Sequence, residues 1–255
     1  MYVECEGVVV GSRPVGETSL WVRVLTAERG TMTVYARGAL KSWRRTGGAL
    51  DTASRTAWVI VPGRSERWLV DQADLIEAHS GLRRSLSSAL RGMFLLEVAR
   101  LHYASGGRLY DHLVTALAAL ARGGPVGRSR EFLWWFVLRT MELSGHAPVL
   151  DVCAIGGHVL DQALIATGAG GTVCRACSHR RGDLLDLGQA GLAALRALST
   201  EGGVDTGPAA ALGGRDARRV GRVLRALLCW PVGGDVAMPA LDQLQYLGRA
   251  RWRSP

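Results

Sequence analysis

Hydrophobic and polar positions alternate with a period of two over about the first 75 residues of the chain. Leu20, Val22 and Val24 alternate with Trp21 and Arg23, which predicts a strand with one buried face. The same pattern predicts five short strands, at residues 3–7, 20–24, 31–36, 56–61 and 68–70. Five strands within so short a length favour a small closed barrel of the OB type, because closure removes the exposed sheet edges.

The hydrophobic period lengthens to that of an α-helix after the predicted barrel. Apolar faces at helical spacing predict helices at residues 86–101, 110–117, 132–143, 187–198 and 217–228. Residues 156–173 are rich in glycine and are predicted to be irregular, with cysteines on both sides. The predicted fold is therefore α+β. An OB-fold barrel at residues 1–78 precedes a helical domain at residues 79–255, which contains a cysteine loop at about residues 150–182.

Charge adds a candidate ligand to this picture. The 255 residues carry a formal charge of +9, which favours an anionic partner such as nucleic acid or an acidic protein segment. Between residues 37 and 67, seven basic residues stand against two acidic ones, a local charge of +5. The candidate DNA-binding residues in this interval are Arg37, Lys41, Arg44, Arg45, Arg55, Arg64 and Arg67.

Three tryptophans, Trp43, Trp58 and Trp68, are interleaved with these cations. Cationic groups beside aromatic rings are typical of proteins that bind single strands, with the rings stacking on bases. The alternative is a solvated loop whose tryptophans only fill the barrel, and Trp58, between Ala57 and Val59, is expected to lie in the core.

Cysteines define a second candidate site. Cys174 and Cys177 have the C-x2-C spacing at which two thiolates can bind one tetrahedral zinc ion, and Cys153 offers a third thiolate. A second C-x2-C motif would need a cysteine at position 156, where Gly156 stands. The fourth ligand is then His158, His179 or absent. A zinc site formed by Cys153, His158, Cys174 and Cys177 is one interpretation, and a remnant that packs without metal is the other.

Catalysis and secretion are not indicated. The sequence contains no P-loop, G-x-S-x-G or H-E-x-x-H motif, and we expect no enzymatic activity or nucleotide cofactor. A thiol hydrolase using Cys174 or Cys177 with His179 is a weaker alternative. No signal peptide or membrane-spanning run is apparent, and an odd number of cysteines, five, favours a reducing compartment. A cytoplasmic location is expected.

Several blocks in the sequence resemble the bacterial RecO family of recombination mediators. They occur in the family's order over residues 4 to about 180, and the resemblance is weak beyond Cys177. The blocks are Glu6-Gly7-Val8-Val9, Gly16-Glu17, Leu25-Thr26, Glu28-Arg29-Gly30, Ala36-Arg37-Gly38-Ala39, Leu143 to Leu150, and Gly170 to Cys177.

The resemblance implies an N-terminal OB-fold, a helical domain and, in many members, a zinc loop of four cysteines. It also implies binding to single- and double-stranded DNA, strand annealing and gap repair beside the nucleoid. The implied partners are RecR and the acidic C-terminal tail of single-stranded DNA-binding protein, with no membrane contact. Arg37, Lys41, Arg44 and Arg45 would face DNA. A barrel scaffold that binds acidic proteins without touching DNA is the alternative function.

Overall fold

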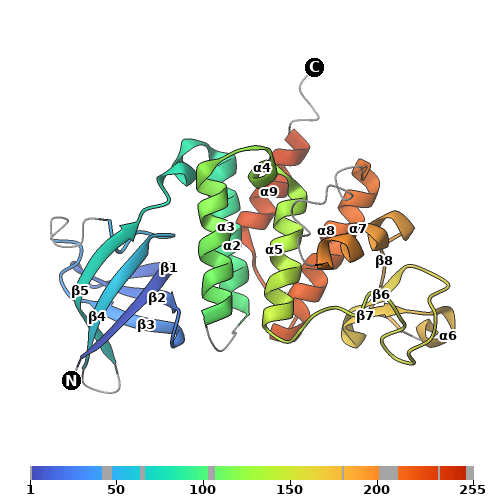
Figure 1. The fold of residues 1–255 in the computed structure, drawn as a ribbon, viewed down its shortest axis with the longest axis horizontal. Coiled ribbons are helices and arrows are strands. Elements are labelled where there is room, and N and C mark those ends of the chain that lie inside the picture. Colours follow the sequence, from blue (N-terminus) through green and yellow to red (C-terminus); the bar gives the residue numbers. More distant parts are fainter. Residues whose placement is uncertain are drawn as a thin grey trace. The chain divides into compact units, whose positions relative to one another are not determined.

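The N-terminal part of the chain is a closed five-stranded barrel with the strand order β1-β2-β3-β5-β4 (Figure 1). The structure is a computed structural model that describes residues 2–41, 48–63, 67–102, 107–179, 181–200, 212–234 and 236–250. The strands are β1 (Val3–Val15), β2 (Ser19–Thr26), β3 (Gly30–Ala36), β4 (Arg55–Pro62) and β5 (Trp68–Glu77). All five predicted strands are present, and the predicted OB-type barrel is confirmed.

Strand alternation produces the core of the barrel. Val22, Val24 and Val34 point inward and are at most 2% exposed, beside the equally buried Trp58 and Ile60. The expectation that Trp58 belongs to the core is confirmed. Neighbouring strands are antiparallel except for β3 and β5, whose short parallel pairing closes the barrel.

Helices α2 (Leu86–Leu101) and α3 (Gly107–Arg122) follow the barrel and pack against each other. The short 3-10 helix η1 (Ser80–Arg84) precedes them and contacts both. A Cβ atom at Gly81 would lie 1.8 Å from the carbonyl oxygen of Ala121, so η1 approaches α3 at a distance that only glycine allows.

The C-terminal helix α9 (Pro239–Ala250) packs against α2, although more than 130 residues separate them in sequence. Glu97 of α2 is 5% exposed, and its Oε1 accepts a hydrogen bond of 3.0 Å from the backbone N–H of Ala240. Burial raises the pKa of Glu97, which the backbone hydrogen bond opposes. A buried side chain of α2 therefore caps the first turn of α9.

The remaining elements form a second group. Its helices are α4 (Pro125–Arg128), α5 (Arg130–Leu143), α6 (Arg175–Ser178), α7 (Gln189–Ser199) and α8 (Gly214–Cys229), with the 3-10 helices η2 (Thr167–Ala169) and η4 (Trp230–Val232). Its strands β6 (Leu164–Ala166), β7 (Gly171–Val173) and β8 (Leu184–Asp186) form a sheet in the order β7-β6-β8. The five predicted helices are all present. The irregular segment predicted at residues 156–173 is wrong in its second half, where β6, η2 and β7 form a hairpin.

The chain divides into two compact units. The first comprises Met1–Gly123 with Met238–Pro255, and the second is Gly124–Ala237. The domain boundary predicted at residue 78 separates the barrel from the helices, whereas the two compact units each contain helices. The predicted domain boundary therefore stays a prediction. Within the described residues, no helix has the length and apolar character needed to span a membrane.

Candidate metal centre and nucleic-acid interface

Two connected turns bring together three of the four cysteines of the second unit. Cys153 and His158 lie in a loop in which the N–H of Cys153 donates to the carbonyl of His158 and the N–H of Gly157 donates to the carbonyl of Cys153. Cys174 caps α6 and Cys177 lies within it. The N–H of Ala154 donates to the carbonyl of Thr172 in β7, which holds the first turn against the second.

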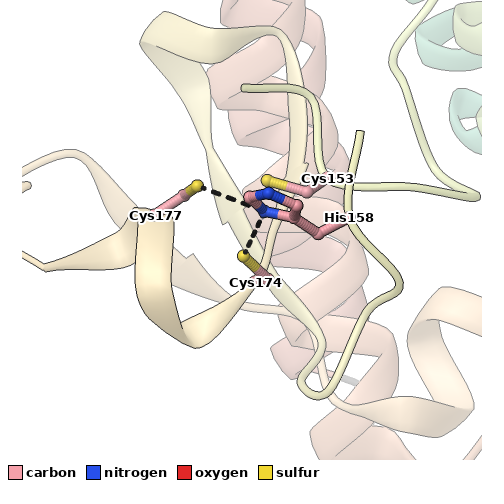
Figure 2. Close-up of side chains that lie close together, drawn as sticks. All are labelled: Cys153, His158, Cys174 and Cys177. Atoms are coloured by element: carbon pink, nitrogen blue, oxygen red, sulfur yellow. Dashed lines mark hydrogen bonds between the residues drawn. The ribbon is translucent and has the colours of Figure 1, made fainter. Parts of the chain in front are cut away.

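The potential ligand atoms of Cys153, His158, Cys174 and Cys177 all lie within 4.8 Å of one another. Figure 2 shows the three sulfurs around the imidazole of His158, whose Nδ1 lies 3.4 Å from the Sγ of Cys174 and 3.7 Å from that of Cys177. Zn–S bonds of about 2.3 Å and Zn–N bonds of about 2.0 Å at a tetrahedral angle place such atoms about 3.6 Å apart. The group can therefore hold a tetrahedral metal ion.

Gly156 provides the space for the imidazole ring. A Cβ atom at this position would lie 2.4 Å from Cε1 and 2.8 Å from Nδ1 of His158. Position 156 is the one at which a second C-x2-C motif would carry its cysteine, so the side chain of His158 occupies the region that a cysteine there would enter. His179, the other candidate fourth ligand, is exposed and is not part of the group.

Hydrogen bonds shift the pKa values of Cys153 and Cys177 in opposite directions. Hydrogen bonds from the backbone, first that of Cys174 and then that of Gly156, lower the pKa of Cys153 to about 6. The pKa of Cys177 is raised to about 11, first by its hydrogen bond with Cys174 and then by burial. Thiolates this close repel one another, and a bound divalent cation would stabilise them together.

The buried hydrophobic cluster of this part of the chain has four members. Cys153 and Cys174 are half of it, together with Ala166 and Val173. The hydrophobic residues packed against it are only partly buried: Leu160, Leu164, Ala169, Cys177 and Leu184. Polar contacts hold the second turn, because Asp161 accepts a hydrogen bond of 2.9 Å from the N–H of Arg175. A core this small stabilises its surroundings weakly, so a metal ion would contribute a large share of the local stability.

The predicted DNA-binding residues have different surroundings on the barrel. Arg37, Lys41 and Arg67 are exposed. The N–H of Leu40 donates to the carbonyl of Thr18, which holds the segment carrying Arg37 and Lys41 beside the turn between β1 and β2. Arg44, Arg45 and Arg64, with Trp43, lie outside the described residues.

Arg55 is instead bonded within the protein. Its guanidinium donates hydrogen bonds of 2.6 Å to Glu6 and 3.1 Å to the hydroxyl of Tyr110 in α3. The hydrogen bond from Arg55 lowers the pKa of Glu6. These contacts join the barrel to α3, and the predicted contact between Arg55 and DNA stays a prediction.

The outer face of β1, β2 and β3 carries a row of residues that includes two aromatic rings. Arg13 pairs with Trp21, and Trp21 pairs with Tyr35, so the three side chains lie on one face of the sheet. The rings of Trp21 and Tyr35 have centroids 5.1 Å apart, and the guanidinium of Arg67 lies 5.7 Å from the Trp21 ring. Arg23, one pair further along β2, is also exposed.

We refer to Arg13, Trp21, Arg23, Tyr35 and Arg67 as the barrel row. Of these five residues, the sequence predicted only Arg67, because the other four lie outside the basic interval at residues 37–67. The alternation along β2 places Trp21 and Arg23 opposite the buried valines and was the available signal. The pairing with Tyr35 depends on strand register, which the alternation does not give.

Comparisons with known proteins identify relatives over most of the chain. The family model described as "Recombination protein O N terminal" matches residues 1–79, and "Recombination protein O C terminal" matches residues 85–237. DNA repair protein RecO of Anaeromyxobacter dehalogenans (strain 2CP-C) is 33% identical over 225 residues, covering 85% of this chain and 87% of the relative. DNA repair protein RecO of Myxococcus xanthus (strain DK1622) is 30% identical over 199 residues, covering 76% and 80%.

Proposed function

The chain belongs to the RecO family of DNA repair proteins, and on that premise we propose that it binds single-stranded DNA on the barrel row and acts as a non-catalytic recombination mediator. Family membership supports a role in DNA repair and recombination. The finer proposal is that the protein anneals strands in gap repair. With RecR and the acidic tail of single-stranded DNA-binding protein as partners, it would help to load the recombinase in the cytoplasm, beside the nucleoid.

The barrel row is the observation that carries this proposal. OB-folds bind oligonucleotides on the face of strands 2 and 3, where Trp21 and Tyr35 lie paired. Every base has an aromatic face, so two adjacent rings bind successive bases with little sequence preference. Arg13, Arg23 and Arg67 provide positive charge for the phosphates beside them.

The phosphate backbone would continue onto the basic interval. We propose Arg37, Lys41, Arg44, Arg45, Arg64 and Arg67 as phosphate contacts, which fix the position of the strand without selecting its sequence. Arg55 could join them only by releasing Glu6 and Tyr110.

Substitution of both rings by alanine, Trp21→Ala with Tyr35→Ala, tests the proposal. Stacking contributes about 1–3 kcal/mol per base, so each ring removed should weaken binding of a fluorescent oligo-dT by roughly 5- to 150-fold. Trp230→Ala, which removes a tryptophan that is 52% exposed in the second unit, is the matched control. Trp21→Phe should retain most of the affinity. Unchanged binding by the double variant, with its fold intact, would refute the barrel row as the DNA site. Failure of the unsubstituted protein to bind oligo-dT would favour the scaffold function.

We also propose that Cys153, His158, Cys174 and Cys177 bind a structural zinc ion. Zinc would close a tetrahedral centre between the two turns and would have no position open for catalysis. Metal analysis of the purified protein should find about one zinc ion per chain, and His158→Ala should reduce it. A chain purified without chelators that contains no zinc, and that takes up none when zinc is added, would contradict the proposal.

A further inference from the structure

Helix α8 carries a row of arginines on its exposed face. Val220, Val223, Leu224, Leu227 and Leu228 form its buried face. The arginines lie on the opposite side within an arc of about 120°, as the 100° rotation per residue requires. They are Arg215, Arg218, Arg219, Arg222 and Arg225.

Three of these arginines have no acidic partner among the residues that the structure describes. Arg219 is bonded to Asp186 at 2.9 Å and to Asp216 at 3.4 Å, and Asp216 is the only acidic residue of the helix. Arg215, Arg218 and Arg222 are exposed and have no ion pair among the described residues. The row begins in the first turn of α8, where the helix dipole is also positive. Arginines at this end of the helix therefore do not stabilise it.

The spacing of Arg215, Arg218 and Arg222 fits a phosphate backbone. Positions 215, 218 and 222 extend over about 10 Å of helix axis at about 1.5 Å per residue. Neighbouring phosphates of a single strand lie farther apart than the rise of about 3.4 Å per nucleotide along a duplex axis, so about two phosphates face a row of this length. Arginine pairs with phosphate through two parallel hydrogen bonds, which lysine cannot form.

The surface beside the row favours a nucleic-acid strand over a peptide. A Cβ atom added at Gly221 would meet no atom of the described residues within 4 Å, so a backbone can approach this side of the helix closely. Peptides usually depend on apolar anchors that fill a pocket, whereas a phosphate backbone needs positive charge and access.

We propose that Arg215, Arg218 and Arg222 form a second binding site for the phosphate backbone of single-stranded DNA. This site lies in the second compact unit, whereas the barrel row lies in the first. A single chain could then hold two DNA segments, either of one strand, with a gain in avidity, or of two strands. The inference adds a site to the proposed function and does not require that the barrel row bind DNA.

The test uses the full chain with Arg215→Gln, Arg218→Gln and Arg222→Gln combined. Glutamine retains the helix propensity and removes only the charge. The matched control combines Arg84→Gln, Arg122→Gln and Arg128→Gln, which are also exposed and lack ion pairs among the described residues. Both triple variants lower the net charge equally. Circular dichroism and melting curves verify that each variant is folded.

Binding of fluorescent oligo-dT is measured over a salt series, with and without the double substitution Trp21→Ala and Tyr35→Ala. The α8 variant should lower the slope of log affinity against log salt by about 1.4 in both backgrounds, from about 0.7 for each of two phosphate contacts. It should also lower the number of short oligo-dT molecules bound per chain from two to one. The control should change neither quantity.

Equal slopes for the α8 variant and its control would overturn the inference. Normal DNA binding by the α8 variant, together with loss of binding to a poly-aspartate peptide, would also overturn it and make α8 a protein-binding surface. Failure of the barrel proposal is distinguishable, because it would appear as normal binding by the Trp21→Ala, Tyr35→Ala protein whatever α8 does.

Discussion

Gly156→Ala should weaken metal binding although glycine is not itself a ligand. The added Cβ would lie 2.4 Å from Cε1 of His158 and 2.8 Å from Nδ1. Ordinary van der Waals contact begins at about 3.4 Å, so the ring would have to move by about 1 Å. Gly156 is not among the positive-φ residues, so the backbone accepts alanine and the collision with the ring is the main cost.

A displacement of about 1 Å is half the length of a Zn–N bond, so His158 could not remain a ligand in its present position. Misplaced ligand support lowers metal affinity by about 10- to 100-fold in comparable sites. We expect a loss in this range for zinc, measured by competition with a chromophoric chelator. The visible spectrum of the cobalt-substituted protein should shift accordingly, because it reports the ligand set directly.

Gly182→Ala is the control, because a Cβ atom there would meet none of the atoms that the structure describes within 4 Å. A double-mutant cycle with His158→Ala separates the ring collision from general destabilisation. If Gly156→Ala weakens zinc binding only by displacing the imidazole of His158, then adding it to His158→Ala should cause little further loss of zinc affinity. Wild-type affinity in Gly156→Ala, or fully additive losses in the cycle, would refute the reasoning.

Two further predictions concern buried polar groups in the first unit. Burial raises the pKa of Glu97 above 4.5, so its contribution to stability is complete below that pH and is lost as pH rises through the folded-state pKa. Glu97→Gln keeps an acceptor for Ala240 and should abolish this decline in Tm, whereas parallel Tm–pH curves for the two proteins would contradict it. Tyr110→Phe removes a hydroxyl that bonds Arg55 and Glu6 and should cost about 1 kcal/mol of unfolding free energy without changing DNA affinity. Reduced DNA affinity at unchanged Tm would instead support the predicted contact between Arg55 and DNA.

The barrel was predictable because its information is local. Val22 and Val24 alternate with Trp21 and Arg23, and burial follows directly from this period. Residue contacts across the sheet were not predictable in this way, since the pairing of Trp21 with Tyr35 requires the register of two strands. Likewise, no local pattern shows that Arg55 is bonded to a tyrosine 55 positions away.

The three cysteines of the metal group could be predicted from the sequence, but the fourth ligand could not. The C-x2-C spacing identifies Cys174 and Cys177 from sequence alone. The choice between His158 and His179 depends on the turn that follows Cys153, which only three-dimensional structure gives. The glycine-rich segment hid a hairpin, because strands as short as β6 and β7 are too brief for a periodic signal.

The packing of α9 on α2 has a consequence for the order in which the protein can be made. The first unit contains the two ends of the chain, so its last helix is synthesised only after residues 124–237. The 137 residues between α2 and α9 take roughly 7–27 s to synthesise at about 5–20 residues per second, and during that time the surface of α2 that receives α9 stays uncovered on the ribosome. A nascent chain that has not yet reached α9 therefore presents this surface to chaperones and proteases, with Glu97 lacking its hydrogen bond from Ala240, and the surface is concealed only once α9 has been made.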